Sequence, residues 1–172
     1  MMNRRQFLLT GVAVVATSSI ALPLLASRYQ GQTAVLIGQL RQLQGKPLQS
    51  SGSWNVSQIF QHLTQSVQGS YLGYPQLRAS WFRHSIGPLA LTGFKAAGAM
   101  KHPLDEAIPA MPPLDPALPA EQALSQLISA LQQFSEASSL SPHFAYGMLN
   151  ADDYACAHRL HIEAHLAQIQ LG

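Results

Sequence analysis

The chain has 172 residues, of which 47% are hydrophobic and only 10% are charged. This length accommodates one compact domain with a targeting segment, and the apolar fraction is high enough to build a core, which argues against disorder. Ten basic residues against eight acidic ones give a net charge of +2, with no basic cluster beyond the N-terminus, which excludes a nucleic-acid binder. The single cysteine excludes an internal disulfide framework.

Residues 1–26 have the pattern of a signal peptide or an N-terminal anchor. Arg4 and Arg5 precede an uncharged, mostly apolar run over residues 7–26, and the core Arg-Arg-x-Phe-Leu resembles the twin-arginine export motif. A general secretory signal and an uncleaved anchor are the alternatives, because twenty apolar residues could also span a bilayer. In each case we expect a periplasmic or exported domain over residues 27–172 that contacts a membrane only through this segment. Both arginines belong to the segment and no acid does, so the remaining domain has a net charge of zero.

Two amphipathic helices are predicted in the first part of this domain. The first covers residues 32–43, where apolar side chains recur on one stripe until Gly45 and Pro47 end the pattern. The second begins at Ser53 as its N-cap and continues to about residue 68, before Gly69. Its apolar face has helical spacing throughout and consists of Val56, Ile59, Phe60, Leu63 and Val67.

A long crossover follows the second helix. Residues 70–103 are mixed in pattern and rich in aromatic side chains, with a short helix expected over 89–97. Residues 100–119 hold six prolines, which remove backbone donors and rule out a regular element, so we expect an extended connection.

Two further helices complete the domain. One is predicted from Pro119 to about residue 136, and the last from its cap Asn150 to about residue 171. No segment alternates with a period of two over a useful length. Four amphipathic helices with one long crossover predict an all-α fold, a four-helix bundle.

Three of the seven histidines lie on the last predicted helix. At about 100° per residue, His158, His161 and His165 share a sector about 100° wide with Tyr154, Ile162 and Ile169, which is the width of a buried face. Buried imidazoles are costly unless each has a partner. His161 and His165 are also spaced i, i+4, which lets two ring nitrogens reach one metal ion.

A third ligand must come from another element, and His62 is the only other histidine on a long predicted helix. Three histidine ligands with an open fourth position describe a catalytic type of zinc site better than a structural one. The alternative is that these are hydrogen-bonded core histidines and one surface histidine.

The sequence resembles a known superfamily at several of these positions. The resemblance lies at Trp54, His62-Leu63 and Ser66, in the run from His143 to Gly147, and in the run from His161 to Gln168. At these residues the sequence resembles a branch of the DinB-like (YfiT-like) superfamily whose function is unknown. The resemblance covers about residues 32–171. It implies a four-helix bundle in which His62, His161 and His165 hold a divalent metal. The wider superfamily includes metal-dependent enzymes that use low-molecular-weight thiols. Phe144 stands where the branch usually has Pro, and export is atypical of the thiol-using members.

The other candidate residues carry less specific signals. His158 is a neighbour of the ligands or a side chain packed against the second helix, and His143 approaches the site or stabilises its turn. His84 and His102 lie in irregular regions and are expected to face solvent. Cys156 points away from the histidines and is expected to be a small buried hydrophobic residue.

Two functions remain open. The first is an exported metalloenzyme, a transferase or hydrolase. In it, Zn²⁺, Ni²⁺ or Fe²⁺ would lower the pKa of a bound water molecule or of the thiol of a small-molecule substrate. The second is a metal-binding or interaction module without turnover. A pocket beside the metal would favour the first, and a closed, packed site the second. The expected partners are a small-molecule substrate and a second copy in a homodimer.

Overall fold

The computed structural model describes residues 33–172, so the predicted signal or anchor over residues 1–26 lies outside the described residues. The described part is mostly helical, as predicted. In chain order its helices are α2 (Thr33–Arg41), α3 (Val56–Leu72), α4 (Ser80–His84), α5 (Ile86–Ala97), α6 (Ala120–Glu136) and α7 (Ala151–Leu166). Two short strands, β1 (Leu48–Ser50) and β2 (Ile169–Leu171), flank them.

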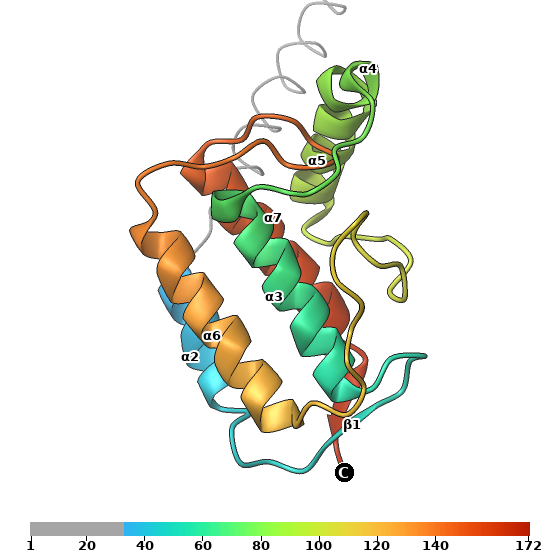
Figure 1. Ribbon diagram of the computed structural model, residues 1–172, viewed down its shortest axis with the longest axis vertical. Helices are drawn as coiled ribbons and strands as arrows, with labels where there is room; N and C mark the ends of the chain where they lie inside the picture. The colour runs from blue at the N-terminus through green and yellow to red at the C-terminus, as the bar shows by residue number, and fades with distance from the viewer. Residues whose placement is uncertain (1–32) are drawn as a thin grey trace, which may run out of the picture.

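The long helices pack side by side around one apolar core. α3 lies against α6 and α7, and α2 lies against α6 and α7 (Figure 1). Their facing side chains are almost completely buried, and removing this apolar surface from water is the main stabilising contribution. Its fully buried members include Leu40, Ile59, Phe60, Leu63, Leu124, Leu127, Leu131 and Tyr154.

Side-chain caps fix where two of these helices begin. Asn55, rather than the predicted Ser53, caps α3: its side chain accepts a hydrogen bond from the backbone N–H of Gln58, whose side chain in turn accepts from the N–H of Asn55. This reciprocal pair is a capping box, which satisfies two otherwise unpaired donors at the helix start. Asn150 caps α7 as predicted, by accepting from the N–H of Asp153.

The predicted end of the last helix was wrong. α7 ends at Leu166, and residues 169–171 instead form β2, which pairs antiparallel with β1 in the register Leu48↔Leu171 and Ser50↔Ile169. The backbone N–H of Gly172 also donates to the carbonyl of Pro47. Neither strand is long enough to show alternation in the sequence, and within residues 33–172 the two strands pair only with each other.

The crossover is irregular over residues 98–119, as predicted, and glutamine side chains of α3 hold it. The Gln61 side chain donates to the carbonyl of Asp115 over 2.7 Å and accepts from the Asp115 N–H over 2.9 Å. Gln65 donates to the carbonyl of Pro112. These bonds replace backbone pairing that a proline-rich segment cannot form.

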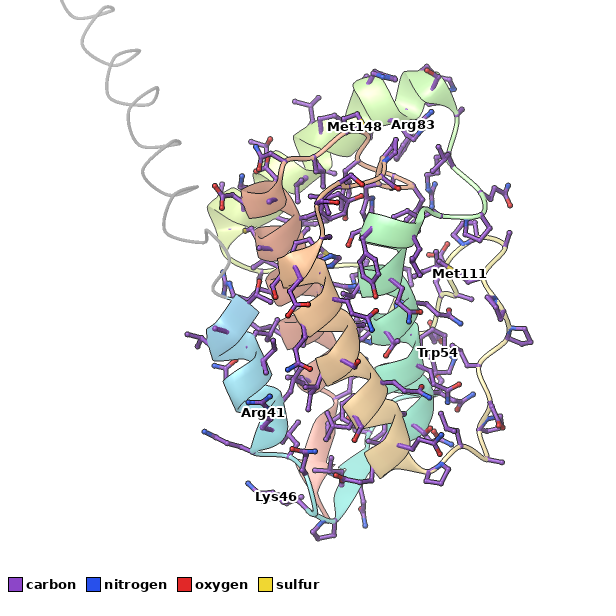
Figure 2. The ribbon with its side chains drawn as sticks, turned by 60° about the vertical axis from the view of Figure 1, so that its left-hand side comes forward. Arg41, Lys46, Trp54, Arg83, Met111 and Met148 are labelled. Carbon is purple, nitrogen blue, oxygen red and sulfur yellow. The ribbon has the colours of Figure 1, made fainter. Side chains whose placement is uncertain are left out.

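Four of the side chains labelled in Figure 2 mark the two ends of the molecule. Arg41 and Lys46 project at one end, whereas Arg83 and Met148 lie at the opposite end, near α4 (Figure 2). Within the described residues, no helix is both long and apolar enough to cross a membrane.

Candidate metal centre

Three histidine side chains converge where α3 faces α7. The Nε2 atom of His161 lies 3.2 Å from Nε2 of His62 and 3.2 Å from Nε2 of His165. His62 comes from α3, and the other two come from successive turns of α7. One nitrogen of each ring lies within 4.8 Å of the others. The structure therefore brings together the three residues that the sequence singled out.

The spacing of these nitrogens fits a bound divalent metal ion. Two nitrogens bound to one tetrahedral ion at the usual zinc–nitrogen distance lie about 3.3 Å apart. Hydrogen bonding among the three rings is a poorer explanation, because Nε2 of His161 carries either one proton or one lone pair and cannot form a hydrogen bond with both neighbouring nitrogens. Three imidazoles suit zinc, nickel or iron better than magnesium or calcium, which prefer oxygen ligands.

Burial keeps all three imidazoles neutral and able to bind a metal. Burial first, and the charge of neighbouring histidines second, lower the pKa of His62 to about 3 and that of His165 to about 4. The pKa of His161 lies well below its ordinary value for the same two reasons. Desolvation disfavours the imidazolium, so each ring has a free lone pair near neutral pH.

Further side chains hold these rings in place. The Ser66 hydroxyl, one turn after His62 on α3, lies 3.2 Å from Nδ1 of His161. Such a bond to the second ring nitrogen orients a metal-binding histidine. On the other side, the Trp54 indole lies almost parallel to the His165 ring at 6.3 Å and within 5.0 Å of the His62 ring, so it covers this side of the cluster.

His102 was expected to face solvent, and that expectation was wrong. Its ring centroid lies 4.9 Å from that of His161 and 5.3 Å from that of His165. Its Nδ1 lies 2.7 Å from the Pro103 carbonyl, and its Nε2 is buried without a partner in residues 33–172. The crossover carries it across the face of the site. Because this segment has no periodicity, the sequence offered only one signal, a histidine at the start of the proline-rich connection.

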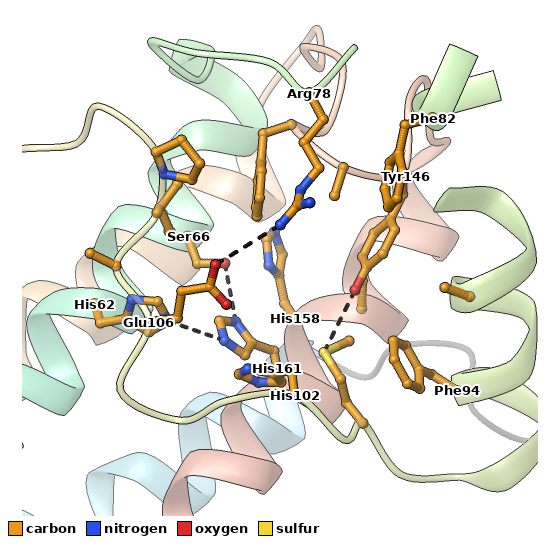
Figure 3. Close-up of a pocket in the computed structure, with 18 residues that line it drawn as sticks. His62, Ser66, Arg78, Phe82, Phe94, His102, Glu106, Tyr146, His158 and His161 are labelled. Carbon is orange, nitrogen blue, oxygen red and sulfur yellow. Dashed lines mark hydrogen bonds and ion pairs between the residues drawn. The ribbon is translucent and has the colours of Figure 1, made fainter. Parts of the chain in front are cut away.

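A pocket of about 230 Å³ opens beside His62 and His161 (Figure 3). Its polar lining includes Ser66, His158 and Tyr146, with Arg78 and Glu106 as the charged members. Its apolar walls come from α4, α5, the crossover and the turn before α7, and consist mainly of Phe82, Phe94, Met100, Ile108 and Phe144. The cluster is thus covered by Trp54 on one side and faces a cavity on the other.

The other candidate residues, His158, His143 and Cys156, have contacts that account for them structurally. The His158 ring packs against the Phe134 ring of α6, with 4.9 Å between the centroids, and against the Tyr154 ring. His143 stabilises its turn, because its Nδ1 accepts hydrogen bonds from the backbone N–H groups of Ala145 and Tyr146. Cys156 is free and buried, in a small cluster with Met100 and Leu160, as the sequence predicted for a hydrophobic residue.

These features define a class of protein: a helical domain with a buried three-histidine cluster next to a pocket. Residues 29–171 match the model of a family described as "Protein of unknown function (DUF1569)", and the chain belongs to this family. No curated protein and no solved structure matches the chain significantly.

Proposed function

We propose that this protein is an exported metalloenzyme of the DinB-like superfamily, with an open divalent metal site formed by His62, His161 and His165. The observation that supports this most directly is the convergence of three Nε2 atoms from α3 and α7. Nε2 of His62 and Nε2 of His165 each lie 3.2 Å from Nε2 of His161. The substrate is a small molecule that enters the adjoining pocket.

The arrangement of the helices supports the superfamily assignment. α2, α3, α6 and α7 would be the four helices of the bundle, with α4, α5 and the proline-rich segment as its crossover. The ligands then come from the second helix and from a His-x-x-x-His on the last, which is the pattern that the resemblance implies.

The pocket favours an enzyme over a storage or interaction module. A zinc, nickel or iron ion at this site would supply a Lewis acid that polarises a substrate group or lowers its pKa. The protein's own contribution is to present three neutral imidazoles, to orient His161 through Ser66, and to exclude bulk water by burial. Three ligands leave a position open, and the pocket lies beside two of them.

Metal content tests this function. Protein purified without an affinity tag should contain about one zinc, nickel or iron ion per chain by elemental analysis, because three converging imidazoles make one site. His62→Ala and His165→Ala should each lose most of it, since two imidazoles hold a divalent ion much more weakly than three. The exposed His84 lies outside the cluster, so His84→Ala is the matched control and should keep the wild-type content. Wild-type metal content in both ligand variants would contradict the proposal.

A further inference from the structure

The pocket beside the histidine cluster has a size and a lining of its own. At about 230 Å³ it is larger than the apolar cavity of about 150 Å³ that binds benzene in another protein. It therefore has room for one six-membered ring and a few more atoms. Its walls include the rings of Phe82 and Phe94 (Figure 3), and the lining also contains Phe144 and Met100.

The charged residues of the lining neutralise one another. Arg78 faces Glu106 at 4.0 Å, and about half of each side chain is exposed, so the pair lies at the rim. The Arg78 guanidinium also lies over the Phe82 ring, 5.1 Å from its centroid. Because the two charges are opposite and paired, the Arg78 and Glu106 side chains add no net charge to the pocket.

Three residues of the lining, His62, His102 and His158, each have a buried ring nitrogen without a hydrogen-bond partner in the described part of the chain, and of these three only His158 lies outside the histidine cluster. Nε2 of His158 is buried and has no hydrogen-bond partner within the described part of the chain, in a residue that is only 3% exposed. By contrast, Ser66 contacts His161, and the Tyr146 hydroxyl lies 3.9 Å from the sulfur of Met100. A buried polar atom costs free energy until something bonds to it. A ligand in this pocket can supply that bond.

We infer that this pocket binds a small molecule that has one ring-sized apolar group, a hydrogen-bonding group directed at Nε2 of His158, and a metal-binding group at the end beside His62 and His161. Only the last of these features rests on the proposed function; the ring and the hydrogen bond rest on the pocket itself. The apolar walls would select the ring by desolvation, and a metal would add affinity at one end.

Two hydroxamates test the inference on metal-loaded protein. Benzohydroxamate and acetohydroxamate share the metal-binding head and differ in a phenyl ring against a methyl group. Calorimetric titration should give benzohydroxamate an affinity at least tenfold higher, because the ring enters the pocket. Ala90→Leu places a larger side chain on the pocket wall and should reduce this preference to less than threefold. Ala97→Leu is the same change on α5 outside the lining and should keep it. Equal affinities of the wild type for the two compounds would overturn the inference while leaving the metal site intact.

A metal-free measurement separates this inference from the proposed function. Benzyl alcohol has a ring and one hydroxyl but no strong metal-binding group. Titrated into metal-free full-length protein, it should shift the NMR signals of Phe94 and Met100 in a saturable way. The shifts should be lost in Ala90→Leu and kept in Ala97→Leu, and His158→Phe should weaken binding at least threefold. Saturable binding by a chain that takes up no metal would support the pocket and refute the metalloenzyme. The absence of saturable shifts in wild-type protein would overturn the inference.

Discussion

At the scale of single residues, burial decides the chemistry of the histidines. The three proposed ligands, together with His143 and His158, are kept neutral mainly by desolvation. For the three ligands, neutrality keeps a lone pair available for a metal. For His143 and His158, neutrality makes the folded state less stable in acid, because the imidazoles can bind protons in the unfolded chain but not in the folded one.

This cost predicts a pH dependence of stability. Burial lowers the pKa of His158 to about 3 from an ordinary value of 6.5. Above pH 6.5 neither state binds the proton, and between pH 6.5 and 3 only the unfolded state does, so acid destabilises the fold. Each such histidine should lower the free energy of unfolding by about 1.4 kcal/mol per pH unit in this window.

Urea unfolding of metal-free protein between pH 7 and 5 measures this effect. His158→Phe should remove about one proton from the pH dependence, because phenylalanine does not titrate. Between pH 7 and pH 5, the free energy of unfolding of this variant should therefore fall by about 2 kcal/mol less than that of the wild type. The same pH dependence in both proteins would show that His158 is not the source.

At the scale of secondary-structure elements, three boundaries differ from their predicted positions. α3 continues past Gly69 to Leu72, because the ring of Tyr74 occupies the place where a side chain at Gly69 would lie. The Tyr74 hydroxyl donates to the carbonyl of Ser66, which holds the ring there. α3 also starts two residues later than predicted, and α7 ends early because β2 pairs with β1. Of these three, only the pairing of β1 with β2 joins distant parts of the chain; Gln58 lies three residues from Asn55, and Tyr74 lies five residues from Gly69.

The contact at Gly69 predicts an unusual response to alanine. Alanine normally stabilises a helix interior relative to glycine by about 0.5–1 kcal/mol. A Cβ at Gly69 would lie 2.2 Å from the Tyr74 ring, so Gly69→Ala should instead destabilise the protein by about 1–3 kcal/mol. Gly93→Ala in α5 is the matched control: nothing lies within 4 Å of its Cβ, and it should be neutral or stabilising. Chemical denaturation measures both, and a Gly69→Ala variant as stable as wild type would contradict the packing argument.

At the scale of the whole molecule, the proposal joins an N-terminal export signal to a histidine cluster and a pocket. The twin-arginine route transports folded proteins, which would let the chain acquire a metal before export. Replacing Arg4 and Arg5 by Lys keeps both positive charges and should still block export, because this route depends on the arginines themselves. Cell fractionation measures the outcome. Normal export of the double variant would indicate the general secretory route.

The sequence by itself determined the helical class, the three main apolar stripes and the three histidines that meet. These features have helical periodicity, and an i, i+4 pair on one face needs no knowledge of the fold to be recognised. Only the tertiary structure decided that His102 lies beside His161 and His165, that Trp54 covers the cluster, and that a pocket opens next to it. These features depend on where an aperiodic, proline-rich crossover crosses the helices, and its position is fixed by side chains such as Gln61 and Gln65 on α3. Contacts between residues some fifty positions apart leave no periodic pattern in the sequence, so folding alone places them.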